Sequence, residues 1–249
     1  MKRVLLAAAA LVLAGCSAAG GTAKHKGLDG SISVDAAASL TGAFDTLKAQ
    51  FERAHPGTSV KITYGASSDL ATQIGQGAPV DVFASASEKN MTQIGSAALD
   101  PKDFVSNTAE IAVPPNNPAH ITSVAELARP GVKVALCAPA VPCGVVASEV
   151  FKNAKITVHP AASLSDVKTT LAAVESGEVD AGVVYVTDVR SAGSKVKAVP
   201  IPASLNAKTT YPIAVLEASK NRALAAAFVA YVRSAAGLKV LTADGFSSP

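Results

Sequence analysis

Residues 31–47 read SISVDAAASLTGAFDTL, a strand pattern that runs directly into a helix pattern. Residues 31–35 predict a short strand, and the small residues 36–39 predict a turn. Apolar side chains then recur at the spacing of one helical face, at Leu40, Phe44, Leu47 and Phe51. A strand followed by an amphipathic helix is the repeating unit of an α/β protein, in which helices cover a mostly parallel sheet.

The same unit recurs along the chain. Residues 59–64 predict a second strand, and Leu70 and Ile74 lie four apart on the helix that follows it. Further strands are expected at residues 80–84, 111–113, 132–136, 156–158, 181–186, 196–201 and 211–216. Further helices are expected at residues 123–128 and 145–151 and after the capping serines Ser165 and Ser219. The polar loop at residues 116–118 indicates a boundary between two lobes.

The N-terminus has the pattern of an export signal. Two cations precede an apolar run at residues 4–14, which is too short for a membrane-spanning helix of about 20 residues. Residues 13–16, LAGC, resemble the bacterial lipobox. This resemblance implies a lipoprotein signal at residues 1–16, with Cys16 lipid-modified and the protein anchored on the extracytoplasmic face of the cell membrane. The alternative is an ordinary secretory signal with an incidental Cys16. Residues 17–29 are expected to form a flexible tether.

Charge and cysteine content narrow the class of protein. The formal net charge is +3, and without a basic run or interleaved aromatics there is no electrostatic footprint for nucleic acid. Cys137 and Cys143 are an even pair in an exported chain, so a disulfide is the leading interpretation. No His or second cysteine pair is near enough in sequence for a zinc site, and redox motifs usually have the shorter spacing Cys-x-x-Cys. We expect neither a metal ligand set nor a cofactor.

Serines occupy two strand-to-helix turns. Ser39 precedes Leu40, and Ser67 and Ser68 precede Asp69. A helix N-terminus presents unpaired N–H groups and the positive end of its dipole, so it stabilises an anion without Lys or Arg. The alternative is that these serines are simply N-caps.

Several segments resemble signature stretches of the periplasmic molybdate-binding protein family. They are residues 36–41 (AAASLT), 77–86 (GAPVDVFASA), 141–144 (VPCG), 182–185 (GVVY) and 245–246 (GF). The resemblance implies a type II periplasmic-binding-protein fold of two lobes, each a mixed, mostly parallel sheet flanked by helices, with the ligand in the interlobe cleft. Lobe I would contain residues 30–112 and 210–249, and lobe II residues 113–209.

The resemblance also implies a site and a function. The anion would be held by the hydroxyls of Ser39, Ser67 and Tyr185 and by the backbone amides of Cys143 and Val167. The protein would capture molybdate or tungstate and deliver it, as a monomer, to the permease of an ABC transporter. Within the pair at residues 67–68, the contacting serine is uncertain by one position.

Other functions remain open on the residues alone. Another oxyanion such as sulfate is the first alternative. A serine hydrolase is disfavoured because the chain has no Gly-x-Ser-x-Gly elbow and its histidines fall in tether or loop contexts. Tyr185 and Val167 each have a simpler interpretation as core residues.

Overall fold

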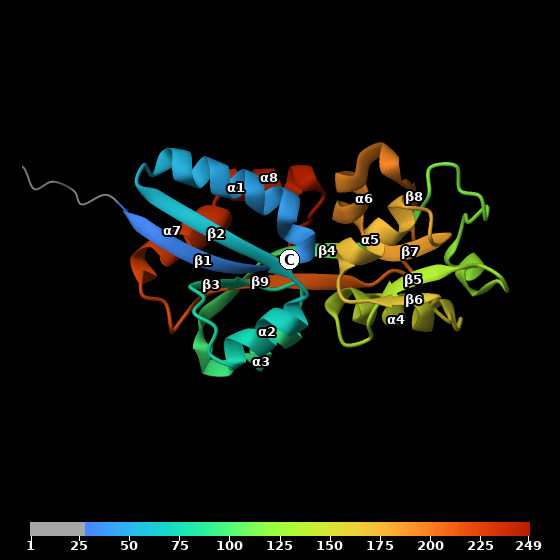
Figure 1. Cartoon of the computed structure of the whole chain (residues 1–249), viewed down its shortest axis with the longest axis horizontal. Coiled ribbons are helices and arrows are strands. Elements are labelled where there is room, and N and C mark those ends of the chain that lie inside the picture. The colour runs from blue at the N-terminus through green and yellow to red at the C-terminus, as the bar shows by residue number, and fades with distance from the viewer. Residues whose placement is uncertain (1–27) are drawn as a thin grey trace, which may run out of the picture.

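The computed structural model describes residues 28–249. The predicted signal, Cys16 and most of the tether lie outside this range. Two lobes lie side by side along the long axis of the molecule (Figure 1). Their strands follow the order β2-β1-β3-β9-β4-β7-β5-β6, and β8 pairs with β4. The α/β architecture of two lobes agrees with the expectation from sequence.

The first lobe is a mixed sheet with helices on both faces. Strand β1 pairs in parallel with β2 and β3, while β9 is antiparallel to β3 and β4. The strands are β1 (Gly30–Ala37), β2 (Thr58–Gly65), β3 (Val82–Ala84), β9 (Lys208–Leu216) and β4 (Ala98–Val113), which continues into the second lobe. The helices are α1 (Thr41–Ala54), α2 (Ser67–Gly75), α3 (Glu88–Gln93), α7 (Arg222–Val232) and α8 (Ala235–Asp244).

The predicted apolar face of α1 packs into the core of this lobe. Phe44, Leu47 and Phe51 are fully buried. The ring of Phe228, from α7, meets Phe51 edge-on at 5.3 Å and Phe44 at 6.3 Å. Edge-to-face pairs of this kind add to the stabilisation from burial, so the two helices are held together on one face of the sheet.

The second lobe has its own mixed sheet and core. Strand β5 (Val134–Cys137) is parallel to β6 (Ala162–Leu164) and β7 (Ala181–Tyr185), and the end of β4 is antiparallel to β7 and β8 (Lys197–Val199). Its helices are α4 (Pro142–Ala154), α5 (Val167–Glu175) and α6 (Val186–Ala192). Short 3-10 helices in the molecule are η1 (Ala38–Leu40), η2 (Gly95–Ala97), η3 (Val124–Ala128) and η4 (Gly193–Lys195).

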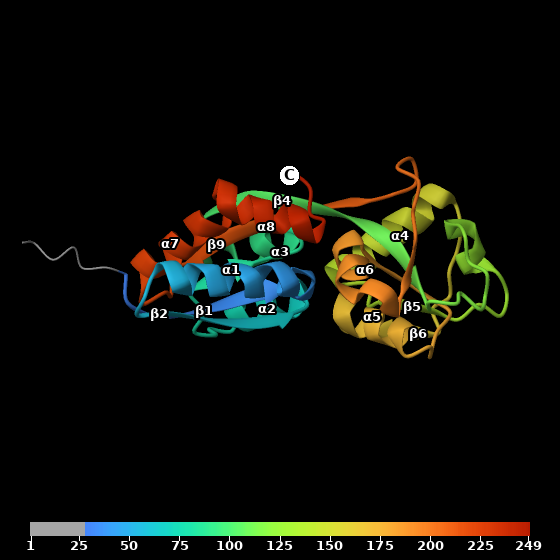
Figure 2. The ribbon, with the colours of Figure 1, turned by 90° about the horizontal axis from the view of Figure 1, so that it is seen from above.

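Two strands connect the lobes. β4 and β9 both cross from one lobe to the other (Figure 2). On β4, Thr108 still pairs with Lys208 of β9, whereas Ala109 already pairs with Tyr185 of β7. The partner change therefore falls a few residues before residue 112. The lobe boundaries given above stay predictions.

Three local expectations from sequence were wrong. Residues 156–158 form no strand; Ile156 and Val158 pack against the core from a loop that follows the left-handed Lys155 at φ 54°. Ser165 does not cap α5, because the carboxylate of Asp166 accepts the amides of Lys168 and Thr169 instead. Ser219 does not cap α7. Its hydroxyl donates to Asp81, 2.6 Å away, and α7 begins later, at Arg222.

Within residues 28–249, no single helix is long and apolar enough to cross a membrane. Taken together, α7 and α8 would be, but the chain bends by 58° between them.

Asp35 is expected to make stability fall with rising pH. Burial raises the pKa of this carboxyl from 3.8 to about 6, so between these values the folded protein keeps a proton that the unfolded chain has released. The contribution of the protonated Asp35 carboxyl to folding stability is complete below the pKa of the unfolded chain. It is lost as the pH rises through the pKa of the folded protein. At pH 7.5, Asp35→Asn should therefore be more stable than wild type by about 1–3 kcal/mol, and the difference should shrink towards pH 4. Urea unfolding at both pH values measures it, and a pH-independent difference would contradict the assignment.

Candidate functional site

The five predicted site residues line one small cavity between the lobes. Ser39 and Ser67 come from the first lobe, and Cys143, Val167 and Tyr185 come from the second. The cavity volume is about 20 Å³, somewhat more than the roughly 10–15 Å³ that one water molecule needs on this measure. The space suits a compact ligand of a few atoms.

Several helices begin at the cavity. α2 begins at Ser67, α5 at Val167 and α4 at Pro142, and all three residues line the cavity. Ser39 lies in η1, which leads directly into α1. The first N–H groups of a helix lack partners within the helix and form the positive end of its dipole. The cavity therefore has the electrostatics of an anion site.

The two serines are not helix caps. The N-cap residues of α1 and α2 are apolar and make no side-chain cap, so the simpler interpretation of these serines was wrong. Ser67 Oγ accepts a hydrogen bond of 2.9 Å from the backbone N–H of Ala86. Ser39 Oγ lies 2.8 Å from the hydroxyl oxygen of Tyr211. Both serines are buried, and each is fixed by a partner distant in sequence.

Two backbone amides of the second lobe precede the first bonds of their helices. In α4, the first helical bond joins the Val145 amide to the Val141 carbonyl, so the Cys143 amide comes before it. In α5, the Asp166 carboxylate accepts from the two amides that follow Val167. The amide of Val167, the first of the helix, is not engaged by that cap. Both positions suit a donor to a ligand.

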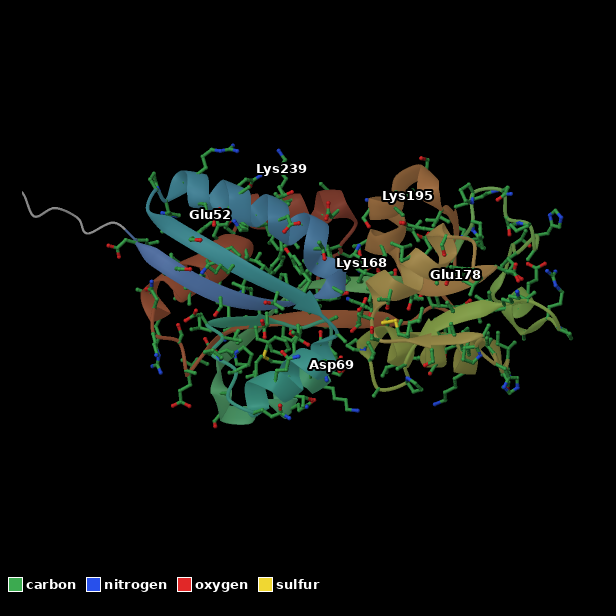
Figure 3. The ribbon with its side chains drawn as sticks, in the orientation of Figure 1. Glu52, Asp69, Lys168, Glu178, Lys195 and Lys239 are labelled. Atoms are coloured by element: carbon green, nitrogen blue, oxygen red, sulfur yellow. A yellow bond between two sulfur atoms is a disulfide. The ribbon has the colours of Figure 1, made fainter. Side chains whose placement is uncertain are left out.

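The loop before α4 is closed tightly on itself. Cys137 and Cys143 form a disulfide with Cα atoms 5.7 Å apart, and Figure 3 shows the yellow bond on the side of the second lobe that faces the first. A Cβ added to Gly144 would lie 2.1 Å from the carbonyl oxygen of Ala138. The start of α4 thus rests directly on the backbone of the loop, which fixes the direction of the Cys143 amide.

Tyr185 ends β7 with its side chain buried. Its hydroxyl has no hydrogen-bond partner among the described residues. Its backbone N–H donates to Asp188, 3.1 Å away, and Asp188 lies 3.2 Å from the ammonium of Lys168, which Figure 3 places beside the junction of the lobes. Burial raises the pKa of the Tyr185 phenol well above its usual value, and the neighbouring Tyr211 hydroxyl and the Asp188 charge raise it further. The phenol therefore keeps its proton. It is a hydrogen-bond donor, and what it lacks is an acceptor.

The chain also matches known proteins over almost all of the described range. Residues 32–247 match the family model of bacterial extracellular solute-binding proteins. The chain belongs to this family.

Individual solute-binding proteins extend the match. The molybdate-binding protein ModA of Mycobacterium tuberculosis (strain ATCC 25618 / H37Rv) is 41% identical over 222 residues, which cover 88% of this chain and 85% of that protein. YvgL of Bacillus subtilis, named as an ABC transporter substrate-binding lipoprotein, is 32% identical over 248 residues, with 96% and 94% covered. The structure of the periplasmic molybdate-binding protein of Azotobacter vinelandii has a TM-score of 0.77 at 21% identity, over 88% of this chain and 99% of that one. The family resemblance and the fold class predicted from sequence are confirmed.

In this solute-binding protein, the cavity offers fixed hydrogen-bond donors, and no cationic side chain is among the described residues that line it. The described residues that line it include no Lys, Arg or His. The carboxylate of Asp166 also reaches the lining, but it is turned to the amides of its own helix. Within residues 28–249, no group of three His, Cys, Asp or Glu side chains could hold a metal ion. The arrangement is suited to holding an anion.

Sequence reasoning missed the residues that support the site of this solute-binding protein. Tyr211 and Ala86 fix the two serines, and Asp188 and Lys168 lie behind Tyr185. Asp188 is fully buried, and its carboxylate accepts the Tyr185 amide at the start of α6. Tyr211 carries the same signal as Tyr185, a tyrosine at one end of an apolar strand, and could have been found by it.

Proposed function

We propose that this chain is an extracytoplasmic binding protein that captures molybdate or tungstate and delivers it to the permease of an ABC transporter. The observation that carries the proposal is the cavity in which hydroxyls and helix N-termini of both lobes converge without a cation. The 41% identity to the molybdate-binding protein of M. tuberculosis supports the choice of ligand. The ligand contacts proposed are the hydroxyls of Ser39, Ser67 and Tyr185 and the amides of Cys143 and Val167.

Neutral donors are sufficient to hold a dianion. Burying an unpaired charge is costly, so the site must replace water by fixed donors. Charge-assisted hydrogen bonds contribute about 1.5–3 kcal/mol each, and each helix N-terminus about 0.3–2 kcal/mol. Five to eight such contacts, less the free energy of ordering and lobe closure, leave about 8–12 kcal/mol, which corresponds to micromolar to nanomolar affinity.

Selection among oxyanions follows from size and from the donor lining. Donors placed for a large tetrahedral anion reach the smaller sulfate poorly, and a protonated phosphate brings a hydrogen that no acceptor takes. Sulfate is the second candidate ligand, because the same kind of lining would serve it. A catalytic role is not proposed, because the described lining of the cavity holds no histidine or lysine that could act as a base.

The cellular setting is proposed from the N-terminus and the relatives. We infer that Cys16 carries the lipid and holds the protein on the outer face of the cell membrane, as a monomer. The match to YvgL, named as a lipoprotein, supports the lipid anchor. Lobe closure about β4 and β9 would then present a ligand-dependent surface to the permease.

Isothermal titration of the chain from Lys26 onwards with molybdate, tungstate, sulfate and phosphate tests the proposal. We expect one-to-one binding of the first two at micromolar affinity or better and no heat with phosphate. Tight binding of sulfate with no response to molybdate would replace the ligand but keep the site. No response to any of the four would leave the family fold with a different ligand.

Loss of the disulfide is expected to lower both stability and affinity. Closing the loop between Cys137 and Cys143 contributes about 2 kcal/mol, so the double variant Cys137→Ala/Cys143→Ala should melt about 4–8 °C lower. Its molybdate affinity should fall because the Cys143 amide is no longer held. Mild reduction of the wild type should have the same effects and should not change the double variant. Unchanged affinity after reduction, with both thiols titrated, would contradict this role of the disulfide.

A further inference from the structure

Ser39, which lines the cavity, pairs with the buried hydroxyl of Tyr211, which is outside the lining. Ser39 comes from η1 and Tyr211 from β9, which are 172 positions apart in the chain. Their oxygens are 2.8 Å apart, and either could donate to the other. Tyr211 is fully buried and Ser39 is 5% exposed. The direction of this hydrogen bond determines what Ser39 can offer to a ligand.

The second serine shows how such a direction is fixed. Ser67 Oγ lies 2.9 Å from the N–H of Ala86, and a backbone amide can only donate. The oxygen of Ser67 is therefore used as an acceptor, and its single proton is left for the cavity. Among residues 28–249, no backbone amide donates to Ser39 Oγ. Tyr211 occupies the equivalent place.

Tyr211 is able to donate. Burial raises the pKa of its phenol above the usual value, so the group is protonated at physiological pH. A hydroxyl carries one proton, and a fully deprotonated oxyanion can only accept. Ser39 can give its proton to such an anion only if its own oxygen is not the donor to Tyr211. The proton of Tyr211 must then point to Ser39.

We propose that Tyr211 is a positioning residue that, by donating to Ser39 Oγ, directs the Ser39 proton to the oxyanion. The inference rests on the proposed function, because it concerns the same anion site. Without the Tyr211 hydroxyl, the Ser39 hydroxyl is free to turn away from the anion, and one charge-assisted hydrogen bond is weakened.

The ring of Tyr211 also packs in the core, and the test must separate the two roles. Its ring lies 5.3 Å from Phe246 and 6.3 Å from Tyr185, contacts that Tyr211→Phe keeps. Tyr231→Phe is the matched control, since the Tyr231 hydroxyl donates to Gln50, 2.8 Å away, from α7. A purely structural role of the Tyr211 hydroxyl would change molybdate affinity by the same factor with or without Ser39.

The experiment is a double-mutant cycle of Tyr211→Phe and Ser39→Ala, read by molybdate titration. Tyr211→Phe should weaken molybdate binding about tenfold in the wild type and less than about twofold in the Ser39→Ala background. Tyr231→Phe should leave molybdate affinity unchanged in both backgrounds. Equal losses from Tyr211→Phe in both backgrounds would overturn the inference.

Molybdate titration of the wild type distinguishes failure of the proposed function from failure of the role of Tyr211. Absence of molybdate binding by the wild type would overturn both, whereas normal wild-type binding without coupling would overturn the inference alone. If Tyr211→Phe does not fold, neutron diffraction of the wild type with molybdate decides instead. A deuteron on Tyr211 directed at Ser39 Oγ supports the inference, and a deuteron on Ser39 directed at Tyr211 overturns it.

Discussion

Gly144→Ala is expected to destabilise the second lobe by about 3 kcal/mol or more and to weaken molybdate binding at least about 100-fold. The new Cβ would lie 2.1 Å from the Ala138 oxygen and 2.8 Å from the Cys137 oxygen. Both are backbone atoms of a loop closed by the disulfide, so they cannot turn away as a flexible side chain could. The first turn of α4 must shift, and the Cys143 amide shifts with it.

Gly75→Ala is the matched control for this substitution. Gly75 is also helical, at the end of α2, and an added Cβ would meet nothing within 4 Å. Alanine there should be neutral or stabilising by up to about 1 kcal/mol. Thermal unfolding and molybdate titration of both variants give the comparison. Wild-type affinity in Gly144→Ala would contradict the proposed role of the α4 N-terminus.

Tyr185→Phe should have opposite effects on binding and on stability. Losing one charge-assisted hydrogen bond should weaken molybdate binding about 10- to 150-fold. The hydroxyl has no hydrogen-bond partner among the described residues, and a buried hydroxyl without a partner is unfavourable. The empty variant should therefore be as stable as the wild type, or more stable by up to about 1 kcal/mol.

Titration and denaturant unfolding of Tyr185→Phe separate a ligand contact from a core residue. Tyr231→Phe, whose hydroxyl is bonded to Gln50, should leave molybdate affinity unchanged. If Tyr185→Phe instead bound molybdate as tightly as the wild type, the Tyr185 hydroxyl would not be a ligand contact. A large loss of stability in the empty protein would show that the hydroxyl has a structural partner.

The sequence predicted what local pattern and short motifs can specify. The apolar spacing from Leu40 to Phe51 gave α1 and its buried face, because helical periodicity is a local property. The motifs gave five residues that the structure brings to one cavity. Their contact with a ligand stays a prediction.

Features that depend on distant contacts were missed. The bond between Ser39 and Tyr211 joins residues 172 positions apart, and no local pattern contains it. Strand β4 was recognised only at its apolar end, residues 111–113, because its earlier part is partly exposed and has register shifts beside Pro101. Helix α8 was not predicted as separate from α7. Gly237, near its start, packs against the end of α7, where an added Cβ would lie 2.2 Å from the Val232 oxygen.

The central claim is that the cavity between the lobes holds the oxyanion. Anomalous X-ray diffraction from crystals grown with molybdate tests it most directly, because molybdenum gives a signal that protein atoms do not. We expect one strong anomalous peak among Ser39, Ser67, Tyr185 and the N-termini of α4 and α5. A molybdenum peak elsewhere, with this cavity holding only water, would contradict the account.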